Sequence, residues 1–163
     1  MKTLLIVWHS RTGAARQMAE AAEAAASEAG ETLVRRLAAE AAGPADLLGA
    51  DGYLFACPEN LASMSGEMKE FFDRCYYPCL GRLSGRAYAA LIAAGSDGEG
   101  AARQLGRIAT GWRLKAICEP LIICTHAQTP EAILAEKRLG DAELTPCREV
   151  GAAMAAGLAM GVF

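Results

Sequence analysis

Short apolar runs alternate along this chain with stretches of helical periodicity, and this alternation constrains the fold more than any other feature. Nearly every residue is apolar in three runs, Lys2–Trp8, Asp51–Cys57 and Arg86–Ala94. Such runs, bounded by turn residues, are typical of strands buried on both faces of a sheet. Two weaker strands are predicted at Thr32–Leu37 and Ala116–Thr125. Strands that alternate with helices in this way predict an α/β fold with a parallel sheet between two helical layers.

Alanine forms much of the apolar face of the predicted helices. The chain contains 35 alanines among 163 residues, so its helices should pack close to a flatter partner. Ala14–Ala29 carries its apolar residues on one stripe, and Gly30 follows where a C-terminal cap belongs. Ala38–Gly49 predicts a loop with a weak helix. Further helices are predicted from Ser65, as a cap, to about Tyr77, and at Ala101–Leu114, Glu131–Leu139 and Pro146–Met160. No linker divides the chain, which predicts a single domain of residues 1–163.

Charge and cysteine usage narrow the functional class. The formal net charge is −3 and no block of lysine or arginine occurs, which argues against a nucleic-acid partner. The first apolar run is too short for an export signal and the apolar tail too short to span a bilayer, so we expect a cytoplasmic protein without membrane insertion. In that reducing compartment the six cysteines are expected to be thiols. Cys75 and Cys79 lack the further ligands that a metal site needs, so no metal is predicted.

The loops at the carboxyl ends of the strands are the expected ligand site of a parallel sheet. The loop after the first strand, His9–Arg16, offers two hydroxyls, a glycine and the start of a helix. This combination suits a phosphate group, although an ordinary strand–turn–helix connection with a threonine cap has the same residues. The phosphate motifs GxxxxGK[ST] and GxGxxG are both absent, which excludes nucleoside-triphosphate and nicotinamide-type phosphate loops here.

The segment Pro58–Arg74 carries the most specific signal. It resembles the P-x-x-x-x-x-M-S-G-x-M-K-x-F-x-D-R segment of flavodoxin-like flavoproteins, especially the tryptophan-repressor-binding-protein type NAD(P)H:quinone oxidoreductases and the NADPH-dependent FMN reductases. The first loop resembles the S-x-T-G-x-T phosphate loop of the same families. The resemblance implies a flavodoxin-like three-layer sandwich with strand order 2-1-3-4-5 and a bound FMN. It also implies NAD(P)H as electron donor, a quinone or similar small molecule as acceptor, and a possible homo-oligomer.

The resemblance assigns three groups of residues to the FMN site. The phosphate loop would comprise Ser10, Arg11, Thr12, Gly13, Ala14 and Ala15. The loop beside the isoalloxazine ring would comprise Pro58, Glu59, Asn60, Leu61, Ala62 and Ser63. The opposite wall would comprise Gly95, Ser96, Asp97 and Gly98.

Several residues depart from the family pattern or leave alternatives open. Ala15 replaces a threonine of many relatives, and Ala62 replaces a glycine that could need a positive φ. Neither ring loop contains an aromatic residue, which favours a reductase with an open flavin face. A flavodoxin-type electron carrier and a binding module without cofactor stay as alternatives. His126 is a candidate proton donor to a quinone oxygen, whereas Cys57 is more typical of inert packing.

Overall fold

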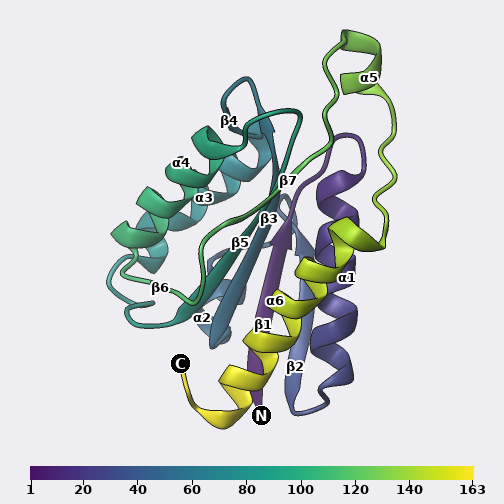
Figure 1. The fold of residues 1–163 in the computed structure, drawn as a ribbon. Coiled ribbons are helices and arrows are strands. Elements are labelled where there is room, and N and C mark those ends of the chain that lie inside the picture. The colour runs from purple at the N-terminus through teal and green to yellow at the C-terminus, as the bar shows by residue number, and fades with distance from the viewer.

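The computed structural model describes residues 1–163, and its centre is a twisted, mostly parallel sheet (Figure 1). The strands run in the order β2-β1-β3-β5, and both β6 and β7 pair with β5 on its far side. Because β6 and β7 together form the expected fifth strand, the predicted order 2-1-3-4-5 is confirmed. The strand bounds are β1 Lys2–Trp8, β2 Thr32–Ala38, β3 Gly52–Asn60, β4 Ser63–Met64, β5 Ala87–Ala94, β6 Lys115–Ala116 and β7 Leu121–Cys124.

Helices cover both faces of this sheet, as a three-layer sandwich requires (Figure 1). On one face lie α1 Ala14–Glu28 and α6 Asp141–Met160; on the other lie α2 Pro44–Gly49, α3 Gly66–Cys79 and α4 Glu99–Gly111. The short α5, Pro130–Leu134, stands apart beyond the carboxyl ends of the strands. None of these helices combines the length and the apolar character needed to cross a membrane.

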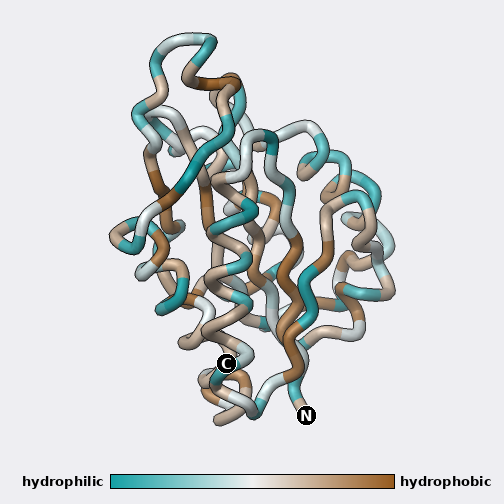
Figure 2. Tube along the Cα trace, turned by 90° about the vertical axis from the view of Figure 1, so that its right-hand side faces the viewer, coloured by the Kyte–Doolittle hydropathy of each residue, from teal (hydrophilic) through white to brown (hydrophobic).

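The two faces of the sheet are packed differently. Alanines of α1 and α6 form most of the helical surface on one face, and the backbones approach so closely that a Cβ on Gly151 would collide with the carbonyl of Ala22. The other face holds the large side chains, including Phe55, Phe72 and Trp112. The Phe72 ring packs against both the Phe55 ring and the Trp112 ring. The strands between them are the most hydrophobic part of the trace (Figure 2). Close alanine packing is therefore confirmed for one helical layer.

Two predicted element ends that lie beside prolines differ from the structure. We expected Pro58 to end its strand, but β3 continues to Asn60. Pairing with β1 stops at Ala56, so Pro58 lies where β3 has a neighbour only in β5 and its missing N–H costs little. Likewise α3 runs through Pro78 to Cys79, two residues beyond the expected end at Tyr77.

The chain after β7 differs most from expectation. Helix α5 ends at Leu134 rather than Leu139, and the residues after it extend along α1. Helix α6 begins at Asp141, five residues before the expected start at Pro146. The carboxylate of Glu143 accepts a hydrogen bond from the Gly140 N–H, which caps the helix one turn earlier than proline placement suggests.

Candidate functional site

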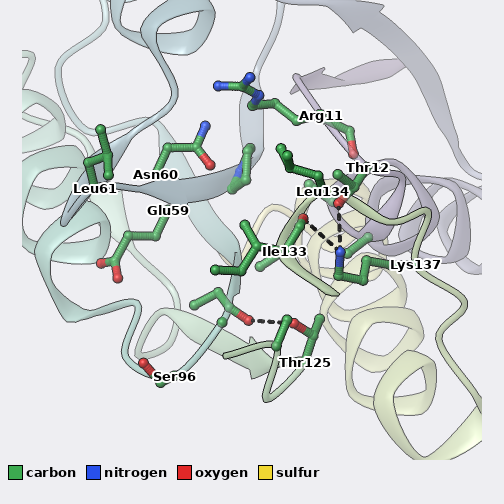
Figure 3. A pocket seen from close by; sticks show the side chains of 18 of the residues that line it. Arg11, Thr12, Glu59, Asn60, Leu61, Ser96, Thr125, Ile133, Leu134 and Lys137 are labelled. Carbon is green, nitrogen blue, oxygen red and sulfur yellow. Dashed lines mark hydrogen bonds between the residues drawn. The ribbon is translucent and has the colours of Figure 1, made fainter. Parts of the chain in front are cut away.

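A cavity of about 470 Å³ opens where the carboxyl ends of β1, β3, β5 and β7 meet (Figure 3). All three predicted loops contribute to it, as does a segment after β7. The lining residues that were predicted from the sequence are Ser10, Arg11, Thr12, Ala14, Ala15, Pro58, Glu59, Asn60, Leu61, Gly95 and Ser96. The others are Ala93, Ala94, Thr125, Ala127, Gln128, Ile133, Leu134 and Lys137.

The loop after β1 leaves hydrogen-bond donors free at the start of α1. The Ser10 hydroxyl accepts a hydrogen bond from the Gly13 N–H at 3.0 Å, and Gly13 itself has a φ of 102°. The backbone N–H groups of Ala14 and Ala15 have no acceptor in the chain, although both residues are buried. Donors in this position need a ligand or water. The loop is therefore chemically suited to an anion, and Gly13 lines an adjoining cavity rather than this one.

The second predicted loop, residues 58–63, is a β-hairpin whose turn has an unusual backbone conformation. Asn60 of β3 pairs with Ser63 of β4, which leaves Leu61 and Ala62 as a two-residue connection. Their φ angles are 51° and 64°, so both residues occupy the left-handed region that the type I′ hairpin turn requires. Ala62 thus adopts the positive φ for which glycine was expected, and the missing glycine does not prevent the turn. The Leu61 side chain is fully exposed at the rim of the cavity.

The far side of the hairpin is fixed to α4. The Gln104 side-chain oxygen accepts hydrogen bonds from the Ser63 hydroxyl at 2.9 Å and the Met64 N–H at 2.8 Å. The Ala62 carbonyl lies where a Cβ on Gly100 would stand, so glycine is required there. As a result, Ala62 and Ser63 face α4 and do not line the cavity.

Glu59 joins the hairpin to the third loop. One carboxylate oxygen accepts a hydrogen bond from the Gly98 N–H at 2.9 Å, and the other accepts one from the Ala101 N–H at 3.1 Å. These donors belong to the first turn of α4, where the helix dipole favours a negative charge. Gly98 takes part in this junction, and both Asp97 and Gly98 lie off the cavity, whereas Gly95 and Ser96 line it.

The segment after β7 forms a wall that the sequence did not reveal. Ile133 and Leu134 of α5 line the cavity although their side chains are largely exposed, and Lys137 follows them close to the phosphate loop (Figure 3). This segment has no strong periodicity, and its place depends on hydrogen bonds between Lys137, Leu139 and Gln17, which lies more than a hundred residues earlier. The one sequence signal for this wall is that the segment follows the carboxyl end of the fifth strand, where parallel sheets bind their ligands.

Neither histidine nor Cys57 is among the residues that line the cavity. The side chain of His126 is exposed, and only its neighbours Thr125 and Ala127 are among the lining residues. His9 Nδ1 lies 2.8 Å from the hydroxyl of buried Ser65, which therefore bonds His9 instead of capping α3. Burial raises the pKa of the Cys57 thiol to about 12, which keeps it protonated. All six cysteines are free, in agreement with the expected thiols.

Comparison with solved structures identifies the fold. A flavodoxin from the domain Archaea superposes with a TM-score of 0.78 over 96% of this chain and 98% of that one, at 18% identity. A WrbA-like flavodoxin from Agrobacterium tumefaciens gives 0.75 over 99% of both chains, at 19% identity. The chain therefore has the flavodoxin-like fold.

Comparison with protein families and curated sequences indicates which flavodoxin-like proteins this chain resembles. The model of the NADPH-dependent FMN reductase family matches residues 41–121, which include the hairpin and the loop after β5. A flavodoxin from Aquifex aeolicus is 32% identical over 61% of this chain, and an NAD(P)H dehydrogenase (quinone) from Acidithiobacillus ferrooxidans is 36% identical over 45% of it. The matched segments span about half the length of these relatives, at 54% and 47%. Together with the fold, the matches support the flavodoxin-like FMN reductase family.

Proposed function

We propose that the cavity binds FMN and that the protein is an NAD(P)H-dependent oxidoreductase that reduces a quinone or similar small acceptor. The observation that carries the proposal is the pair of free N–H groups at Ala14 and Ala15, beside the Thr12 hydroxyl. They supply donors for one phosphate group at one end of the cavity. The matches to an FMN reductase family and to a flavodoxin favour a flavin as the molecule that carries this phosphate.

The rest of the cavity suits a flat ring system. Pro58–Leu61 form one wall, Gly95 and Ser96 form the second, and Ile133 and Leu134 add apolar cover. No aromatic side chain lines the cavity, which leaves room beside the ring for a nicotinamide or an acceptor. When bound, FMN would supply the hydride and electron transfer, and the residues of these walls would orient the flavin and the nicotinamide and limit water.

A free carboxylate at position 59 would disfavour an anionic electron donor beside the flavin, but the Glu59 carboxylate is not free. Its two carboxylate oxygens are both occupied by N–H groups at the start of α4. The helix dipole and these donors offset much of its negative charge. The remaining sequence-based assignments, namely a proton-donating His126, a homo-oligomer, a cytoplasmic location and a single domain, stay predictions.

The proposal is tested first by identifying the flavin. Protein reconstituted with a mixture of FMN and FAD should release FMN on heating, because the loop ends in a single phosphate site and GxGxxG is absent. Chromatography of the released flavin distinguishes the two. Recovery of FAD, or of no flavin, contradicts the proposed cofactor.

A substitution in the phosphate loop tests whether the FMN phosphate binds at this end of the cavity. Thr12→Val keeps the side-chain shape but removes a hydroxyl from the anion site, which should weaken FMN binding roughly tenfold while riboflavin binding is unchanged. Thr110→Val, on an exposed turn of α4, is the matched control and should change neither affinity. Equal FMN affinity of Thr12→Val and the parent would place the phosphate elsewhere.

An electron carrier of the flavodoxin type is the alternative, because one curated relative and several solved structures are flavodoxins. Such a carrier would bind FMN equally well, so flavin binding alone does not separate the two. The response of the bound flavin to a nicotinamide does, and an exposed Leu61 beside the cavity would then be a contact for a protein partner.

A further inference from the structure

Lys137 reaches the proposed phosphate site from the opposite end of the sequence. Its backbone N–H donates a hydrogen bond to the Thr12 carbonyl at 2.7 Å, and its Nζ lies 3.4 Å from the Thr12 hydroxyl (Figure 3). The Gln17 side chain holds the same segment by donating to the Lys137 carbonyl at 2.7 Å and accepting from the Leu139 N–H at 2.9 Å. The backbone of Lys137 is therefore held against the phosphate loop and the start of α1.

The positive charge of Lys137 has no counter-ion in the chain. Its Nζ donates to the carbonyls of Ile133 and Ala135 at 2.9 and 2.6 Å, which are neutral acceptors at the end of α5. No carboxylate lies within ion-pair distance of it, whereas nearby Arg16 has Glu20. The Arg11 guanidinium, on the phosphate loop, points away from Thr12 in Figure 3. Lys137 is thus the cation that the structure directs at the Thr12 hydroxyl.

We propose that Lys137 is a ligand of the FMN phosphate and that it links phosphate binding to the position of α5. A phosphate dianion beside the Ala14 and Ala15 N–H groups would draw the ammonium into a charge-assisted hydrogen bond. Because the same ammonium holds the Ile133 and Ala135 carbonyls, the phosphate would also fix the residues that cover the cavity. This inference rests on the proposed FMN site and adds to it a residue from outside the predicted loops.

The test compares two flavins that differ only in the phosphate. Lys137→Met keeps the length of the side chain but removes its charge, and Lys137→Arg keeps the charge. FMN and riboflavin are titrated into each protein and binding is followed by quenching of flavin fluorescence. We expect Lys137→Met to bind FMN about tenfold or more weakly with riboflavin affinity unchanged, and Lys137→Arg to recover most of the loss. The salt dependence of FMN binding should become shallower in Lys137→Met.

A control variant and two contrary results complete the test. Lys115→Met, at an exposed site beside the amino end of β5 and so at the opposite end of the sheet, is the control and should leave both affinities unchanged. An equal loss for FMN and riboflavin in Lys137→Met would mean that the residue only anchors α5, and no loss would mean that it does not reach the phosphate; either result overturns the inference. If the parent protein binds neither flavin, the proposed function itself fails.

Discussion

The carboxylate of Glu59 lies 2.9 Å from the Gly98 N–H and so joins the β3–β4 hairpin to the start of α4. Two walls of the candidate site come from segments some forty residues apart, and this contact fixes their separation. A second hydrogen bond, to the Ala101 N–H, makes the carboxylate a cap supplied by a distant strand. Gly98, with a φ of 91°, permits this approach where a side chain would collide with Ile122.

Removal of this contact should destabilise the protein. Glu59→Ala leaves two N–H groups of α4 without an acceptor and should lower the free energy of unfolding by about 1–2 kcal/mol. Glu59→Gln retains one acceptor oxygen and should cost less. Denaturant titration measures both, and Glu28→Ala at the exposed end of α1 serves as a near-neutral control. Equal stability of Glu59→Ala and that control would show that the cap contributes nothing.

The hairpin turn offers a gain in stability. Ala62 has a φ of 64°, a conformation that costs a residue with a Cβ about 1–2 kcal/mol, whereas glycine adopts it freely. After the greater entropy of unfolded glycine is subtracted, Ala62→Gly should raise the free energy of unfolding by about 0.5–1 kcal/mol. The same change at Ala24, exposed within α1, should lower it by about 1 kcal/mol. Destabilisation of similar size at both positions would refute the strained turn.

His9 makes folding sensitive to pH. Burial lowers its pKa below the ordinary value of 6.5, an effect that Glu67 opposes and Arg11 supports. Because the unfolded chain takes up the proton first, stability should be constant above about pH 6.5 and should fall as the pH drops from there towards the folded-state pKa. His9→Gln, which can still bond the Ser65 hydroxyl, should lose less stability between about pH 7.5 and about pH 5.5. Parallel losses in parent and variant would assign the effect to other groups.

The sequence predicted the framework well because buried apolar runs and amphipathic periods are local properties. The alternation of strands and helices followed from that pattern, and with it the expectation that the loops after Trp8, Cys57, Ala94 and Thr125 lie at one edge of the sheet. The order of the strands came from the resemblance to flavodoxin-like proteins. The wall from Ile133 to Lys137 could not be predicted, since it depends on contacts with Gln17 that no local pattern encodes. The orientation of Ala62, Ser63 and Gly98 away from the cavity likewise depends on tertiary partners, Gln104 and Glu59.

Anaerobic mixing of the FMN-loaded protein with NADPH or NADH measures whether the bound flavin takes electrons from a nicotinamide. We expect the yellow absorbance of oxidised flavin to be lost at a rate that rises with nicotinamide concentration. Addition of a quinone should then restore it. If dithionite bleaches the flavin but neither nicotinamide does, the protein is not a nicotinamide-dependent reductase and the electron-carrier function takes its place.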